Sequence, residues 1–134
     1  MYLTESQSPS GATYLVMIAD CVVATDLAQS VTDFSPQAQV IVKSDPGAAL
    51  EAAALAASIT VAFVERAPKS FERSELARMI VQKGGRVILL GAEAEELGPS
   101  AGYAVLQRPF SSRMVLEHLS RLVHAAEPEA GGAR

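Results

Sequence analysis

The fold of this chain is decided by the stretch YLVMIADCVVATDLAQSVTDFSPQAQVIV, residues 14–42. Residues 14–19 and 39–42 are short aliphatic runs with the Val and Ile content that is typical of buried strands. Between them, residues 22–34 repeat apolar side chains at spacings of three and four, which gives one apolar stripe on a helix. The stretch therefore predicts a strand, a helix and a second strand that runs parallel to the first.

The same alternation of strands and helices continues along the chain. Three further aliphatic runs indicate strands, at residues 59–64, 86–90 and 103–106. Helical patterns lie between them, at residues 46–57, 70–83 and 111–124, with a short, weak helix at 93–101 that Gly98 and Pro99 break. Five strands joined in this way predict a flavodoxin-like three-layer α/β/α sandwich with a five-stranded parallel sheet in the order 2-1-3-4-5.

Local signals mark the ends of three of these helices. Asp45 followed by Pro46 is typical of a helix start, with the carboxylate as cap and the proline in the first turn. Ser111 or Ser112 can cap the last helix in the same way. The Gly84-Gly85 pair is expected to end the third helix.

Composition bounds the class of protein. The chain has 134 residues, of which 49% are hydrophobic, so one domain with a proper core is expected over residues 13–125. A flexible segment is expected at residues 1–12 and a disordered tail at 126–134. The net charge of −4 gives no electrostatic reason to expect nucleic-acid or anionic-membrane binding. A single cysteine, no basic leader and no apolar run near the ~20 residues of a membrane span favour a cytoplasmic protein.

Two stretches of sequence resemble one known family. Residues 103–122, YAVLQRPFSSRMVLEHLSRL, resemble the last strand, loop and helix of a response-regulator receiver domain, with Arg108, Pro109 and Phe110 where that family has Lys-Pro and often Phe. VVATDL, residues 22–27, is similar to the first helix of such domains. The resemblance covers about residues 14–123 and implies the flavodoxin-like fold already predicted from periodicity.

The resemblance also implies which positions carry phosphorylation chemistry. Glu65 stands at the phosphoacceptor position that the family fills with Asp, and Asp20 is the one acid left in the acidic loop that holds Mg²⁺, although the register also allows that loop to fall on Ile18 and Ala19. Gly91 replaces the hydroxyl residue that ends the fourth strand, and Arg108 replaces the lysine. Each substitution removes a different chemical group that the resemblance assigns to phosphorylation.

These departures lead to the expectation of a stand-alone, degenerate receiver that is not an enzyme. It would act in signal transduction through protein–protein interaction, without standard Asp phosphorylation, cofactor or metal, beyond at most weak Mg²⁺ binding at Asp20. One alternative is an atypical response regulator that retains phosphate or Mg²⁺ binding. Another is a small flavodoxin-like protein that binds a ligand at the carboxyl ends of the strands.

Several side chains leave alternatives open. Glu65 and Arg108 either form a permanent ion pair or are solvated rim residues, with Arg66 as another partner. Asp20 is expected to cap the first helix, and Cys21 is expected to be a buried apolar thiol and not a nucleophile.

Other side chains bear on partners and metals. His118 and His124 are six residues apart on the last helix, a spacing that does not build a metal site. The expected partner is a histidine kinase, a regulator or a second copy of the chain. A homodimer would use the last strand and helix, through a mixed surface made of Tyr103, Arg113, Glu117 and Arg121.

Overall fold

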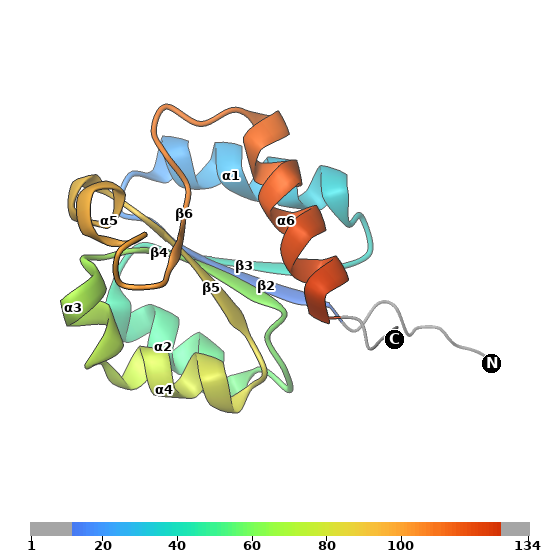
Figure 1. Ribbon diagram of the computed structural model, residues 1–134. Helices are drawn as coiled ribbons and strands as arrows, with labels where there is room; N and C mark the ends of the chain where they lie inside the picture. Colours follow the sequence, from blue (N-terminus) through green and yellow to red (C-terminus); the bar gives the residue numbers. More distant parts are fainter. Residues whose placement is uncertain (1–11, 127–134) are drawn as a thin grey trace, which may run out of the picture.

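The computed structural model describes residues 12–126, and the segments 1–11 and 127–134, expected to be flexible, lie outside the described residues. One parallel sheet runs through the domain in the order β3-β2-β4-β5-β6 (Figure 1), which confirms the predicted order 2-1-3-4-5. Its strands are β2 (Thr13–Met17), β3 (Gln39–Lys43), β4 (Val61–Glu65), β5 (Arg86–Leu90) and β6 (Ala104–Val105). Most observed strands lie within a residue or two of the predicted bounds, and β6 is shorter.

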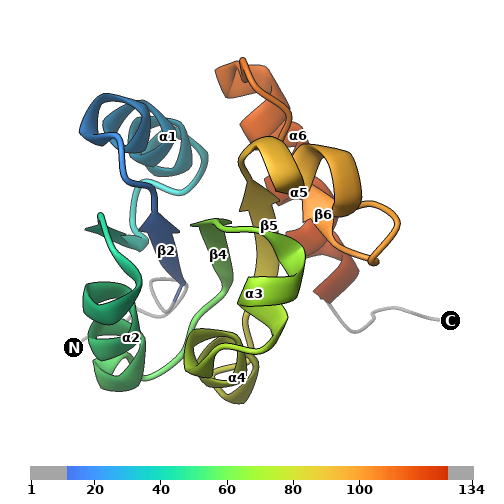
Figure 2. The same ribbon diagram turned by 90° about the vertical axis from the view of Figure 1, so that its left-hand side faces the viewer.

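Helices cover both faces of the sheet, as expected for right-handed parallel crossovers. On one face lie α1 (Cys21–Phe34) and α6 (Ser112–Ala126) (Figure 2). On the other face lie α2 (Pro46–Leu55), α3 (Pro68–Glu72) and α4 (Glu75–Gln82). The short helix α5 (Ala92–Leu97) follows β5.

The core forms two apolar layers, one on each face of the sheet. Side chains alternate along β2, so that Val16 packs toward α1 and α6 while Leu15 packs toward α2 and α4. In β4, Phe63 and Val64 divide in the same way, and all four of these side chains are fully buried. The central strands therefore read as continuous aliphatic runs because both of their faces are covered.

The predicted caps are confirmed. The Asp45 carboxylate accepts a hydrogen bond from the Ala48 N–H at 2.9 Å at the start of α2, and the Ser111 hydroxyl accepts one from the Met114 N–H at 3.2 Å at the start of α6. After α4, Gly84 adopts a φ of 84°, which a residue with a side chain rarely adopts.

The single helix predicted at residues 70–83 is wrong, because the chain forms α3 and α4 there with a break between them. Ser74 is the cause. Its hydroxyl accepts a hydrogen bond from the Ala77 N–H at 3.1 Å and donates one to the Phe71 carbonyl at 2.6 Å. This side chain ends one helix and caps the next, a competition with the helical backbone that serine favours.

The connection from β5 to β6 is compact. Helix α5 ends at Leu97, four residues before the predicted end, and Gly98 lies where an added Cβ would come within 2.5 Å of both the Ala94 carbonyl oxygen and Val105 Cγ2. Gly98 therefore lets the end of α5 pack directly on β6. Within the described residues, no helix is long and apolar enough to span a bilayer.

Candidate functional site

The carboxyl ends of the strands bring together the positions that sequence analysis singled out. Glu65 ends β4 and is half-buried, and its Oε1 accepts a hydrogen bond from the backbone N–H of Ala19 at 2.9 Å. Ala19 lies in the loop that follows β2, the neighbouring strand. The Glu65 carboxylate thus has a backbone donor, and this hydrogen bond ties the loop after β2 to the end of β4.

Asp20 serves as the cap of α1, as predicted. Its Oδ1 accepts hydrogen bonds from the Val22 N–H at 2.9 Å and the Val23 N–H at 3.3 Å. Ile18, one of the alternative acid positions, is buried and apolar. Among the residues that the structure describes, no three acidic, histidine or cysteine side chains gather in a way that could hold a metal ion.

Gly91 lies beside Glu65 at the end of β5. Its φ of 109° belongs to the region that favours glycine, and an added Cβ would lie 3.7 Å from Glu65 Cγ. A hollow of about 250 Å³ opens here, lined by Glu65, Arg66, Gly91 and Glu93 among others. The hollow therefore has no hydroxyl group at Gly91 to contact a phosphoryl oxygen.

Arg108 pairs with a residue that the sequence analysis did not consider. Its Nε lies 2.7 Å from Oε2 of Glu95, and its backbone N–H donates to the same oxygen at 3.1 Å. The Arg108–Pro109 peptide bond is cis. Glu65 and Arg108 therefore do not pair with each other. Glu65 accepts a hydrogen bond from Ala19, and Glu95, on α5, pairs with the guanidinium of Arg108.

The pair shifts both ionisation equilibria toward the charged forms. The hydrogen bond from Arg108 holds the pKa of the Glu95 carboxyl below its usual value of 4.5. The same hydrogen bond, followed by the charge of Glu95, raises the pKa of the Arg108 guanidinium. The one sequence signal for Glu95 was its place in the first turn of the helix predicted at residues 93–101.

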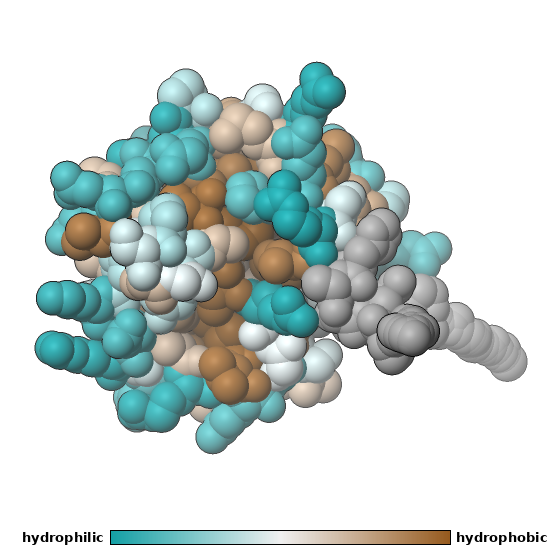
Figure 3. Space-filling model, in the orientation of Figure 1, coloured by the Kyte–Doolittle hydropathy of each residue, from teal (hydrophilic) through white to brown (hydrophobic). Residues whose placement is uncertain are grey.

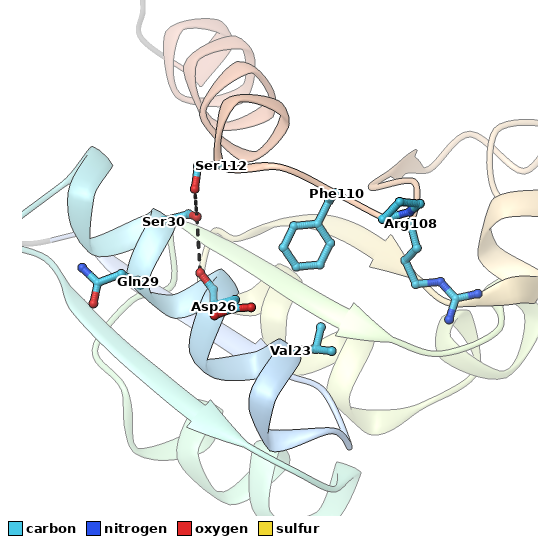
Figure 4. Close-up of a pocket in the computed structure, with 8 residues that line it drawn as sticks. Val23, Asp26, Gln29, Ser30, Arg108, Phe110 and Ser112 are labelled. Carbon is cyan, nitrogen blue, oxygen red and sulfur yellow. Dashed lines mark hydrogen bonds between the residues drawn. The ribbon is translucent and has the colours of Figure 1, made fainter.

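A second hollow, of about 430 Å³, lies between α1 and the loop that leads into α6 (Figure 4). The ring of Phe110 projects into it toward Val23. The hydroxyls of Ser30 and Ser112 are hydrogen-bonded at 2.9 Å, and the Ser30 hydroxyl also donates to the Asp26 carbonyl at 3.3 Å. Ser30 was not predicted from the sequence, where its signal is a polar residue at a buried position of the apolar stripe of α1.

The surface expected for self-association is divided by the sheet. Arg113 and Glu117 lie exposed on α6, where Arg113 Nε is 3.7 Å from Glu117 Oε2. Tyr103 does not join them, because it packs on the opposite face of the sheet against Phe71, edge to face, with ring centroids 5.9 Å apart. Strand alternation sends Tyr103 and Val105 to the face of α4. A surface that includes both Tyr103 and α6 would therefore extend around β6 to both faces of the sheet.

Cys21 corrects another expectation. It was expected to be buried, but it is exposed at the first position of α1, where the chain leaves the sheet. On α6, His118 is half-buried, and the side chain of His124 lies outside the described residues.

Comparison with known proteins identifies the fold. No protein-family model matches the sequence, and no curated protein matches it. A response regulator receiver protein from Sinorhizobium medicae is similar in structure, with a TM-score of 0.70 at 20% identity over 90% of this chain and 100% of that one. The chemotaxis protein CheY4 of Vibrio cholerae gives 0.62 at 17% identity, over 83% and 98% of the two chains.

A third similar structure is the pilus assembly protein CpaE from Caulobacter crescentus, with a TM-score of 0.55 at 20% identity over 86% of this chain and 98% of that one. All of these likenesses extend over most of the chain at low sequence identity. The chain therefore has the fold of a response-regulator receiver domain.

Proposed function

We propose that this chain is a degenerate receiver domain that acts in signal transduction by binding another protein, without Asp phosphorylation and without enzymatic activity. The observation that carries the proposal is the hydrogen bond between the Glu65 carboxylate and the Ala19 N–H. One oxygen of the carboxylate that would receive a phosphoryl group is thereby engaged in a contact internal to the fold.

The neighbouring groups support the same proposal. Transfer of a phosphoryl group to a carboxylate needs a metal ion held by several oxygen ligands and cations that meet the transferred oxygens. Here Asp20 is used as a helix cap, Gly91 offers no hydroxyl, and Arg108 is held by Glu95. Each position therefore has a structural task in place of a catalytic one.

The face around β6 supports a protein partner. Beside β6 lies a mostly apolar hollow of about 470 Å³, lined by Phe71, Ala77, Val81, Val87 and Tyr103 among others. Figure 3 shows hydrophobic surface on this side of the molecule, between hydrophilic rims. Val81 is 69% exposed, although it is a large apolar side chain. Exposed apolar surface with a polar rim is typical of a protein-binding site.

We place the partner among signalling proteins, such as a histidine kinase or another regulator, because the structural relatives include a response regulator and a chemotaxis protein. The face of β6 and α6 would bind it. The proposal also places the protein in the cytoplasm, where a lone exposed thiol such as Cys21 stays reduced.

The proposal is tested with labelled protein, Mg²⁺ and beryllofluoride, which imitates a phosphoryl group. The amide of Ala19 is the reporter, because its N–H binds the Glu65 carboxylate. We expect no saturable change of its chemical shift. The Glu65→Gln variant is the control. A saturable change in the unmodified chain that is lost in this variant would overturn the proposal and favour a regulator that retains phosphate or Mg²⁺ binding.

The same sample can test the partner. Addition of the dimerisation domain of a histidine kinase from the same organism is expected to shift amides of β6 and α6. A small molecule retained by the purified protein in native mass spectrometry, with no shift from any signalling domain, would instead favour a flavodoxin-like ligand-binding protein.

Glu65→Asp is expected not to restore phosphorylation by acetyl phosphate. The shorter carboxylate recovers the usual acceptor, but the acid at Ala19 and the hydroxyl at Gly91 are still missing. Intact-mass measurement after incubation with acetyl phosphate and Mg²⁺ is the check. A stable phosphoprotein from this single change would show that the missing groups are dispensable.

A further inference from the structure

The outer edge of β3 offers backbone groups that are free to pair. Among the strands that the structure describes, only β2 borders β3. The Gln39 N–H donates to Ala12, and the Lys43 carbonyl accepts from Ile18, so residues 39 and 43 direct backbone groups toward β2. Because alternate residues point these groups to opposite sides, Val40 and Val42 direct two N–H and two carbonyl groups outward. Such an edge is a template for another strand.

Side chains beside this edge are open as well. A hollow of about 410 Å³ lies between β3 and α2, lined among others by Ile41, Lys43, Ala48, Glu51, Ala52 and Leu55. Leu55 is 88% exposed, and Val42, on the other face of the strand, is 43% exposed. The edge therefore combines free backbone groups with apolar side chains that water surrounds.

We propose that a second copy of this chain pairs with this edge, β3 against β3 and antiparallel, with the twofold axis passing through Ile41. In this register Val40 lies opposite Val42 of the second copy, and each such pair exchanges both of its hydrogen bonds. Two pairs give four hydrogen bonds. The two sheets then form one continuous sheet that joins the five described strands of each copy.

The same register makes the side chains self-complementary. Opposite residues of paired strands share a face, so Ile41 meets Ile41 of the second copy and Gln39 meets Lys43. Glu51 lines the same hollow as Gln39, and in this register Lys43 of the second copy lies opposite Gln39, so the two charges lie on the same face of the sheet. Neither Lys43 nor Glu51 has an ion pair with any described residue of its own chain. Opposite charges are thus free to meet across the axis.

The helices beside the edge leave room for this pairing. Helix α2 packs on both β2 and β3, so its axis runs over the gap between them. With strands ~4.8 Å apart, the two α2 helices would run about 10 Å apart across the axis, a separation at which helices pack. The flank of α2 that lines the hollow carries Ala48 and Ala52, which are small enough for that approach, and the exposed Leu55, which the approach would bury.

Helix α1 meets the same condition on the other face, because it also packs on β2 and β3. Its contact with α6 runs through Ser30. By helical geometry the flank away from α6 carries Cys21, Thr25, Ala28 and Thr32, all small and uncharged. No charge on this flank opposes the approach of a second α1.

This pairing goes beyond the proposed function and is independent of it. β3 and β6 are the two opposite edges of the sheet. A dimer through β3 therefore leaves β6 and α6 free on both copies, so that one dimer presents two partner-binding faces that point apart.

The first experiment tests the proposed strand register by disulfide cross-linking. In a Cys21→Ser background, the Ile41→Cys variant is expected to form a covalent dimer on mild oxidation, because Cα atoms of a directly opposed pair lie ~4.5 Å apart. Gln39→Cys is the matched control on the same strand and face. Its two copies would lie about 13 Å apart, too far for a disulfide. Equal cross-linking of both variants, or none of Ile41→Cys, overturns the proposal.

The second experiment uses the unmodified chain and charge reversal. Light scattering is expected to give a mass near twice the 14.1 kDa of the chain as concentration rises. Lys43→Glu and Glu51→Lys should each shift this equilibrium toward monomer, and the double variant should restore the dimer. This interface is excluded if the chain stays monomeric up to ~1 mM. It is also excluded if neither single change shifts the dimer equilibrium. Neither result bears on whether Glu65 accepts a phosphoryl group.

Discussion

Glu95 and Arg108 form an ion pair between helix α5 and the loop that follows β6. Because the pKa of Glu95 is lowered in the folded chain, the pair stabilises the fold above the ordinary pKa of a carboxyl, and this stabilisation is lost as pH falls through the lowered value. We expect Arg108→Gln to raise the pKa of Glu95 toward its usual value of 4.5, as measured by a carboxyl carbon titration. Arg113→Gln, on α6, should leave it unchanged.

A Glu95 titration that is the same with and without Arg108 would contradict this pairing. In that case the carboxylate would be held by backbone donors alone. The comparison with Arg113→Gln separates the specific contact from the general loss of one positive charge, since both variants change the net charge equally.

His118 reports on the packing of α6 against the sheet. Burial lowers its pKa below 6.5, the charge of Arg121 lowers it further, and Glu117 and the backbone of Val105 act in the opposite direction. Between the lowered and the ordinary value the unfolded chain binds more protons, so the free energy of unfolding rises with pH in that window. We expect an imidazole titration to show the lowered midpoint.

Two neighbours of His118 give opposite controls. Arg121→Gln should move the His118 midpoint up and Glu117→Gln should move it down, since they remove charges of opposite sign. Movement of both variants in the same direction would mean that the helix has shifted and that the neighbouring charges are not the cause.

At the residue scale, the sequence places site positions better than it places their partners. Glu65, Gly91 and Arg108 were predicted to lie at the carboxyl ends of strands, and they do. The partner of Arg108 was not predicted, because strand periodicity fixes where a side chain starts and not which neighbour it reaches. Glu95 comes from a short helix whose path depends on the packing of Gly98 against Val105. The exposure of Cys21 likewise depends on how α1 leaves the sheet.

Helix α1 depends on Asp20 for its start. The carboxylate caps two backbone N–H groups that have no partner within the helix. We expect Asp20→Ala to lower the free energy of unfolding by about 1 kcal/mol in a urea titration. Asp26→Ala, an exposed acid in the middle of the same helix, should change it by less than ~0.5 kcal/mol.

The same pair of variants distinguishes a cap from a metal ligand. If Asp20 serves only as a cap, Asp20→Ala lowers the free energy of unfolding by the same amount with and without Mg²⁺. A stabilisation of the unmodified chain by Mg²⁺ that disappears in Asp20→Ala would show that the carboxylate binds the ion, because only a ligand of the folded state stabilises it.

At the element scale, regular periodicity was enough for most helices and strands. The break between α3 and α4 could not be read from apolar spacing, because it depends on whether the Ser74 hydroxyl bonds the backbone or points to water. The small size of β6 has a similar origin. Residues 103–106 have strand character, but the turn after α5 leaves two of them paired with β5.

The sheet is unevenly secured across its width. β2 and β4 each have strands on both sides and apolar layers above and below. β6 pairs with β5 over two residues, and no other described strand lies beyond it. Local opening is easiest where few buried contacts and few ladder hydrogen bonds must be broken. We therefore expect the edge at β6, which the proposed function assigns to partner binding, to open most readily.

Native-state hydrogen exchange can measure this difference. The amide of Leu106 donates to the Leu89 carbonyl at 3.0 Å, just past the end of β6, while Phe63 lies in the middle of β4. We expect Leu106 to exchange through a partial opening whose free energy is lower and hardly changes with dilute urea. Phe63 should exchange only on global unfolding, with the full urea dependence, because its strand is enclosed on every side.

Gly98→Ala sharpens the comparison. The added methyl group would lie 2.5 Å from Val105 Cγ2, so it should speed exchange at Leu106 beyond any change at Phe63. If Leu106 and Phe63 instead show equal free energies and equal urea slopes, β6 belongs to the same cooperative unit as the central strands. A partner at that edge would then bind a preformed surface, and its affinity would not include the cost of closing a strand that opens locally.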